Sequence, residues 1–178
     1  MTLRIFSGLV VFFLNSIITD NAFSQSLFME YSVNLKSKDL DSFQVSLRVD
    51  NIKSDSVIFQ FAATTPGIYS VLDAGRFTGS FFAYDSLNRP LASRKINTNQ
   101  YVIYNANRLY RLNYKIAENY DTKTKTNKFG IGCAGSNYDT NNVLINGFWL
   151  FGYFHGYKDN AITVSFEIPD EWQIAGTL

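Results

Sequence analysis

The chain has 178 residues, a formal net charge of +1 and 17% charged residues, and no basic run interrupts it. Nucleic-acid binding needs a concentrated cationic face, so that class of function is not indicated. Sixteen Phe and eleven Tyr against three Pro indicate strands with aromatic packing rather than disorder. The single cysteine, Cys133, cannot form an internal disulfide, so we expect a small buried residue there and a fold held by its core.

Residues 1–24 have the three parts of a secretory signal peptide. A positive charge near the start precedes the apolar residues 5–18, and Ala22-Phe23-Ser24 offers small residues at the two positions that a signal peptidase reads. The alternative is a membrane helix, but a span needs about 20 consecutive apolar residues and this run is shorter. We therefore expect export to the periplasm or the extracellular space, no stable membrane span after signal removal, and a mature domain over residues 25–178.

Apolar and polar residues alternate along most of this domain, which is the pattern of half-buried strands. Phe43, Val45, Leu47 and Val49 give the clearest example, and the polar residues between them form the wet face. No helical period persists for three turns. The sequence therefore predicts an all-β fold, an antiparallel β-sandwich of about eight to ten strands. The clearest expected strands cover residues 28–36, 43–50, 57–61, 77–84, 91–96, 101–104, 109–116 and 162–168.

Four segments of the chain have a distinct composition. The stretch 59–82 has apolar strands on both sides of a Thr64-Thr65-Pro66-Gly67 turn, where Pro fixes its own φ and Gly supplies a positive φ. Residues 85–90 are the strongest hairpin connection, because Asn and Pro supply turn geometry. Residues 118–128 read as a surface loop, and residues 129–142 are the least regular part of the chain.

The chain contains no catalytic constellation. Zinc peptidases use two imidazoles one helical turn apart beside a carboxylate, as in H-E-x-x-H, whereas His155 is the only histidine and is expected to be packed or surface-exposed. There is no G-x-S-x-G element and no pair of carboxylates fixed by spacing. The run Gly130–Gly135 matches a dinucleotide fingerprint superficially, without the flanking strand and helix patterns. The sequence thus predicts no catalytic residue, no metal ligand and no cofactor in this chain.

The nearly continuous aromatic and aliphatic stretch 144–157 allows three interpretations. Its aromatic residues could form core, because aromatic rings supply much of the packing area in small β-domains. They could instead form a patch that faces another domain, or a platform for stacking carbohydrate. The residues concerned are Phe148, Trp149, Phe151, Tyr153 and Phe154.

Tyr69 and Arg76 follow the Pro66-Gly67 corner, and their roles are also ambiguous. Tyr69 could brace the corner by packing against it, and Arg76 could pair with a nearby carboxylate. Either side chain could otherwise face a partner.

Several short motifs follow one another along the chain: Thr65-Pro66-Gly67-Ile68-Tyr69, Asp73-Ala74-Gly75-Arg76-Phe77, Ala83-Tyr84-Asp85, Leu109-Tyr110-Arg111-Leu112-Asn113-Tyr114-Lys115, Ile145-Asn146-Gly147, Phe151-Gly152-Tyr153-Phe154-His155-Gly156 and Ile168-Pro169-Asp170-Glu171-Trp172. Taken in this order, they resemble the N-terminal domain of the M61 peptidases, the glycyl aminopeptidase family. The resemblance covers nearly all of residues 28–178, and its specificity lies in the order of the motifs. One departure is Thr64, where many members have Trp two positions before the Pro.

This resemblance implies a β-rich accessory domain ahead of a thermolysin-like zinc domain that carries H-E-x-x-H. Zinc is expected only in that catalytic domain, which this sequence lacks, and the full-length relative would be a zinc aminopeptidase. The expected partner is therefore a metallopeptidase catalytic domain, in cis or in trans. The alternative is a free-standing exported module that binds glycan or peptide. Candidate interface residues are Tyr69, Arg76, Phe148, Trp149, Phe151, Tyr153 and His155.

Overall fold

A computed structural model describes residues 27–37, 41–120 and 135–176. The predicted signal peptide over residues 1–24, Cys133 and most of the Gly130–Gly135 run lie outside these ranges. Within them, no helix is long and apolar enough to cross a membrane.

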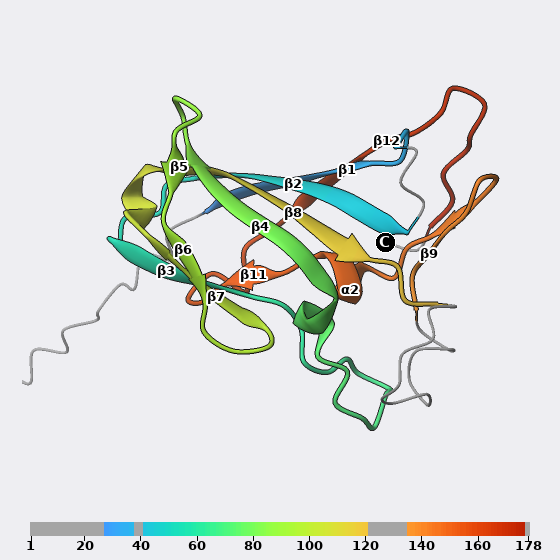
Figure 1. Cartoon of the computed structure of the whole chain (residues 1–178), viewed down its shortest axis with the longest axis horizontal. Coiled ribbons are helices and arrows are strands. Elements are labelled where there is room, and N and C mark those ends of the chain that lie inside the picture. Colours follow the sequence, from blue (N-terminus) through green and yellow to red (C-terminus); the bar gives the residue numbers. More distant parts are fainter. Residues whose placement is uncertain (1–26, 38–40, 121–134, 177–178) are drawn as a thin grey trace, which may run out of the picture.

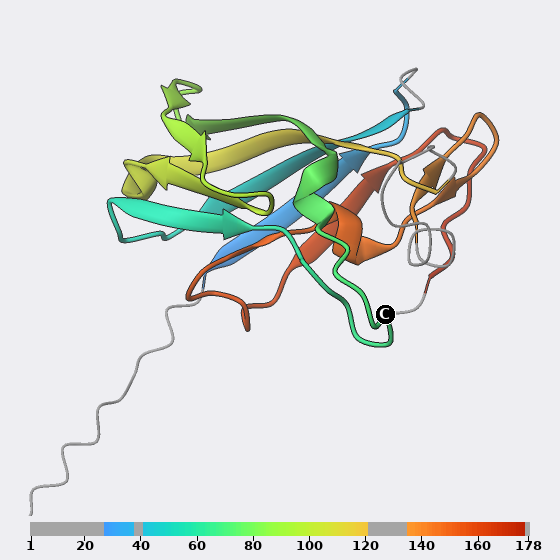
Figure 2. The same ribbon diagram turned by 60° about the horizontal axis from the view of Figure 1, so that its bottom comes forward.

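Two sheets face each other across one core, and a two-stranded ribbon extends from one end (Figures 1 and 2). The fold is all-β, as the sequence predicts. The six-stranded sheet has the order β12 (Thr163–Glu167), β1 (Phe28–Asn34), β2 (Ser42–Asp50), β8 (Leu109–Ala117), β4 (Thr78–Asp85) and β5 (Pro90–Leu91). The four-stranded sheet has the order β11 (Tyr153–Phe154), β3 (Ser56–Gln60), β7 (Gln100–Tyr104) and β6 (Ser93–Lys95). The ribbon pairs β10 (Val143–Leu144) with β9 (Asn137–Tyr138). Short helical turns are η1 (Ala74–Phe77), η2 (Ala106–Arg108) and α2 (Gly147–Leu150).

Three details differ from the expected sandwich. The described residues form twelve strands rather than eight to ten, because four of the strands have only two residues. The pairing of β1 with β12 is parallel, whereas every other pair is antiparallel. The expected strand over residues 91–96 is split, since β5 belongs to one sheet and β6 to the other.

Side-chain alternation explains the core. Because successive side chains point to opposite faces of a sheet, every second residue of β1, β2 and β8 faces the four-stranded sheet. Leu47 lies opposite Tyr31 on one neighbouring strand and Leu112 on the other, and all three are fully buried. Phe59 and Ile103 supply the matching layer from the four-stranded sheet. The intervening residues of β1, β2 and β8 form the outer face.

Two tyrosines reach across the core to the end of α2 and the residues that follow it. Tyr31 Oη donates a hydrogen bond to the carbonyl of Gly152 (2.6 Å), and Tyr114 Oη donates one to the carbonyl of Leu150 (2.7 Å). Burial raises the pKa of both phenols well above the usual value, so both remain neutral donors in the folded protein. The six-stranded sheet therefore fixes the position of the aromatic segment that follows α2.

The connection between β4 and β5 is held by one carboxylate. Asp85 accepts the backbone N–H groups of Leu87 (3.0 Å) and Arg89 (2.9 Å), together with Arg89 Nε (2.8 Å) and Arg108 Nη2 (2.6 Å). Its side chain is only 3% exposed. Desolvation alone would raise the pKa of Asp85. The hydrogen bonds from Arg89, Arg108 and Leu87 together have a larger effect in the opposite direction, so the pKa lies well below its usual range.

Replacing Asp85 by asparagine is therefore expected to destabilise the protein at neutral pH, by an amount that shrinks in acid. A carboxyl group with a lowered folded-state pKa contributes its stability above the unfolded pKa of about 3.9 and loses it as the pH falls toward the folded value. Urea denaturation over a pH series should show a steeper loss of stability for the wild type than for Asp85→Asn below about pH 4. Asp170→Asn, at an exposed carboxylate, is the control and should follow the wild-type curve. A difference between wild type and Asp85→Asn that stays constant across the series would contradict this account.

Candidate functional site

The predicted Pro66-Gly67 turn lies at the tip of a long loop, residues 62–74, here called the Pro66 loop. The loop closes at its neck, where the backbone N–H groups of Leu72 and Asp73 both donate to the carbonyl of Ala63 (2.8 and 3.0 Å). Leu72 is fully buried at this point. Gly67 has a φ of +84°, the positive value that the turn was expected to need. The loop is therefore closed and anchored at its base while its tip projects from the body (Figure 2).

Asn99 fixes the base of the Pro66 loop to the four-stranded sheet. Its Nδ2 donates to Asp73 Oδ1 (2.7 Å), its Oδ1 accepts the Gly75 N–H (3.0 Å), and its carbonyl accepts the Phe61 N–H (2.8 Å). Gly75 packs so closely here that a Cβ would lie 2.4 Å from the carbonyl oxygen of Thr98. Both ends of the loop are thus tied to the same residue.

Two expectations about the Pro66-Gly67 corner are wrong. Tyr69 is fully exposed, so it does not brace the corner by packing. Arg76 pairs with no carboxylate in the described part of the chain: its guanidinium lies over the Phe77 ring at 4.9 Å, and its buried Nε and Nη2 have no hydrogen-bond partner. The loop is held instead at its base, by the backbone hydrogen bonds to Ala63 and by the contacts of Asn99.

The aromatic residues of the stretch 144–157 divide between the core and the surface. Trp149 is 0% exposed and meets the Phe77 ring edge-on, with the ring centroids 5.2 Å apart. Because it has no accessible surface, Trp149 does not provide a platform for carbohydrate. Phe154 is also fully buried. The half-buried members are Phe148, Phe151 and Tyr153.

His155 lies at the surface, immediately after β11. Its Nε2 is 2.7 Å from Gln60 Oε1 and 3.4 Å from Gln100 Nε2, and its ring stacks 6.2 Å from that of Tyr153. Its neighbours are amides rather than carboxylates or thiols. Over residues 27–37, 41–120 and 135–176, no group of three His, Cys, Asp or Glu side chains is placed to hold a metal ion.

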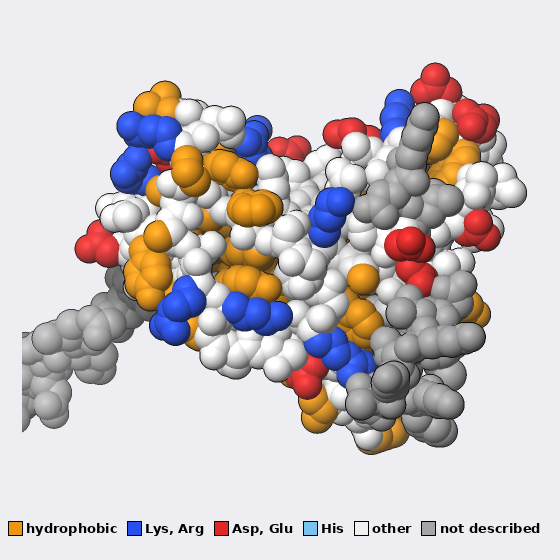
Figure 3. All heavy atoms as spheres, in the orientation of Figure 1, with side chains coloured by type: hydrophobic (Ala, Val, Ile, Leu, Met, Phe, Trp, Pro, Cys, Tyr) orange, Lys and Arg blue, Asp and Glu red, His pale blue; other side chains and the backbone are white. Residues whose placement is uncertain are grey.

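Four exposed apolar side chains lie on the Pro66 loop, the β9–β10 ribbon and the segment after β12. Both ribbon views place the Pro66 loop, the β9–β10 ribbon and the segment after β12 at the end opposite the β4–β5 turn (Figures 1 and 2). In the space-filling view, hydrophobic side chains lie over the Pro66 loop at the lower edge (Figure 3). We call this region the loop end. Its exposed apolar residues are Tyr69, Val71, Leu144 and Ile174.

Comparison with known proteins places this geometry in context. A family model described as "Peptidase M61 N-terminal domain" matches residues 30–178. The crystal structure of an aminopeptidase N family protein from Idiomarina loihiensis superposes with a TM-score of 0.66 at 14% sequence identity, covering 81% of this chain. The chain spans only 22% of that protein's length, and at this identity the likeness concerns the fold alone. No curated protein matches the sequence.

Proposed function

Because the chain belongs to the family of peptidase M61 N-terminal domains, we propose that it is a non-catalytic domain that packs on a zinc peptidase domain and helps to shape its substrate cleft. The observation that carries the proposal is the Pro66 loop. A partner-facing surface should present apolar or aromatic side chains that are held in place before binding.

The Pro66 loop meets both requirements. Tyr69 and Val71 are exposed at or near its tip. The neck hydrogen bonds to Ala63 and the contacts of Asn99 restrict the loop before any partner arrives. Such pre-ordering lowers the conformational entropy that binding must remove, so more of the contact energy appears as affinity.

Zinc chemistry belongs, in this proposal, to the partner domain. The described residues do not fit a zinc site, because His155 is surrounded by Gln60 and Gln100 and no cluster of three potential ligands is present among them. The contribution of this chain is therefore structural: it forms one side of the substrate cleft, and its loop end fixes the position of the partner domain. We also propose that the chain is exported to the periplasm or the extracellular space, with residues 1–24 as its leader.

The test is association with a zinc peptidase domain of the M61 type that is encoded by the same genome and produced without its own β-domain. Isothermal titration calorimetry of the two polypeptides should show a saturable complex. Tyr69→Ala should weaken that complex by about tenfold or more, since tyrosine is enriched among interface hot spots and truncating a hot-spot residue costs about 2 kcal/mol or more. The purified zinc domain should also gain or change peptide-hydrolysis activity when the complex forms.

Leu87→Ala provides the matched control, because Leu87 is 69% exposed in the β4–β5 turn at the opposite end of the molecule. It should leave the affinity unchanged. If the wild-type polypeptides fail to associate, the proposal is wrong. If both variants weaken the complex equally, the loop end is not the docking surface.

A further inference from the structure

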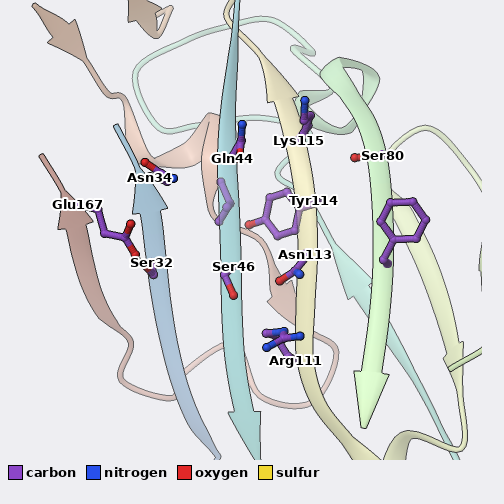
Figure 4. Close-up of a pocket in the computed structure, with 12 residues that line it drawn as sticks. Ser32, Asn34, Gln44, Ser46, Ser80, Arg111, Asn113, Tyr114, Lys115 and Glu167 are labelled. Carbon is purple, nitrogen blue, oxygen red and sulfur yellow. Dashed lines mark hydrogen bonds between the residues drawn. The ribbon is translucent and has the colours of Figure 1, made fainter. Parts of the chain in front are cut away.

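The outer face of the six-stranded sheet, on the side away from the core, is hollowed over its interior strands. The hollow has a volume of about 450 Å³ and is formed by β1, β2, β8 and β4, with β12 at its rim. Figure 4 shows side chains from all five strands projecting over this one face. Half of the twelve lining residues have uncharged side chains that can hydrogen-bond over this face. The uncharged polar residues are Ser32, Asn34, Gln44, Ser46, Ser80 and Asn113.

Several of these groups have no hydrogen-bond partner among the residues that the structure describes. Ser46, Ser80 and Asn113 make no side-chain hydrogen bond within the described part of the chain, and the buried Oδ1 of Asn113 lacks a partner altogether. The buried Nε of Arg111, two residues away on the same face of β8, is also unpaired. Buried polar atoms are nearly always hydrogen-bonded in proteins, so two unpaired ones in the lining of a hollow mark side chains that gain hydrogen bonds by turning toward a ligand there.

An exposed aromatic ring lies beside these polar groups. Phe82 on β4 is directly opposite Asn113 on β8 in the strand register, and its side chain is 54% exposed. The pair of residues therefore offers an apolar ring face and an amide at adjacent positions. A phenyl ring left in water on a sheet face gains free energy when an apolar surface covers it.

The charges around the hollow are nearly balanced. Arg111 donates to Asn88 Oδ1 and lies over the Tyr84 ring, so its charge is already engaged. Glu167 accepts a long hydrogen bond from Ser32 (3.5 Å). Lys115 is the remaining charged group of the lining. A lining of this kind is complementary to a ligand with many hydroxyl groups and no net charge.

We propose that this hollow binds a neutral oligosaccharide. Sugar rings carry hydroxyl groups that both donate and accept, which suits serine, asparagine and glutamine, and they carry a C–H face that packs on an aromatic ring. An extended peptide is a poorer fit because peptides add to free strand edges, whereas β1, β2, β8 and β4 each have a strand on both sides. A protein partner would need a larger apolar centre than one exposed phenyl ring.

The proposal is tested with the purified 178-residue chain and a panel of soluble hexasaccharides built from glucose, xylose, mannose or N-acetylglucosamine. Calorimetric titration up to about 1 mM should detect saturable binding of at least one of them. Phe82→Ala and, separately, Ser46→Lys should each reduce that affinity about tenfold or more, the first by removing the ring and the second by filling the hollow with a charged chain. Both positions lie on the solvent side of the sheet, and circular dichroism verifies that each variant is folded.

Tyr104→Ala is the matched control, since Tyr104 is another exposed aromatic residue but lies on β7 in the other sheet. It should bind the same sugar as tightly as the wild type. The proposal is overturned if no member of the panel binds, or if a bound sugar is retained with full affinity by both Phe82→Ala and Ser46→Lys. It stands apart from docking at the loop end, so either can fail without the other.

Discussion

Replacing Trp149 by alanine is expected to lower the free energy of unfolding by about 3–5 kcal/mol, the range typical of removing a fully buried large aromatic side chain. The indole has no exposed surface, packs edge-on against Phe77 and lies 4.4 Å, centroid to centroid, from the Phe148 ring. Its removal would leave a cavity between η1 and α2. Neighbouring rings cannot collapse into such a space without leaving their own contacts. Urea denaturation of the wild type and the variant measures the difference.

Tyr69→Ala is the matched control for this experiment. Both residues are large aromatics that the sequence places among the same interface candidates, yet Tyr69 is fully exposed. Its replacement should change the free energy of unfolding by less than about 0.5 kcal/mol. The two variants thus separate two roles: loss of stability without a specific effect on association for Trp149, and loss of association without loss of stability for Tyr69. Equal stability of the two variants would place Trp149 outside the core.

The strands that could be predicted are those in which apolar and polar residues alternate within the strand's own sequence. In β2, the residues Phe43, Val45, Leu47 and Val49 are buried and the residues between them are not, as the alternation requires. What cannot be seen locally is the strand partner. The parallel pairing of β12 with β1, which puts Val164 beside Tyr31, joins segments more than 130 residues apart. The alternation in β12 predicts which side chains face inward, but it does not predict the direction of the neighbouring strand.

The aromatic residues show a second limit. Composition identifies Tyr69 and Trp149 as candidates, but exposure depends on what covers each ring. A local signal existed for Tyr69, because it follows a Pro66-Gly67 turn and turn tips are normally at the surface. For Trp149 the decisive contact is Phe77, 72 positions earlier in the chain, and no sequence pattern predicts that contact.

The hollow on the six-stranded sheet is lined by residues whose orientation the alternation predicts but whose proximity it does not predict. Ser46 and Asn113 were both predictable as outward-facing residues of amphipathic strands. Their proximity follows only from the strand order, in which β2 and β8 are neighbours and bring Ser46 opposite Asn113. Phe82 joins them because β4 pairs with the other edge of β8. A polar wet face becomes a candidate binding surface once the topology places its residues together.

A methyl group at Gly152 is expected to be as damaging as the loss of the Trp149 indole. A Cβ at this position would lie 2.5 and 2.6 Å from two ring carbons of Phe59 and 2.7 Å from the carbonyl oxygen of Gln60. Neither neighbour can yield. The Phe59 ring is fully buried, with the ring of Phe154 at a centroid distance of 5.2 Å, and the Gln60 oxygen belongs to the backbone of β3. Moving Gly152 itself would break the hydrogen bond that its carbonyl accepts from Tyr31.

Gly152→Ala is therefore expected to reduce the free energy of unfolding by about 3 kcal/mol or more, at the upper end of the cost of overpacking a core. Gly79→Ala is the control, because a Cβ there would meet nothing nearer than Lys115 Cβ at 3.9 Å, an ordinary contact. That variant should be as stable as the wild type or slightly more stable, since alanine restricts the unfolded chain more than glycine does. Chemical denaturation of the wild type, Gly152→Ala and Gly79→Ala measures the three free energies of unfolding. If Gly152→Ala were as stable as Gly79→Ala, the close approach of Gly152 to the Phe59 ring, and with it the packing of the segment between α2 and β11 against the four-stranded sheet, would have to be abandoned.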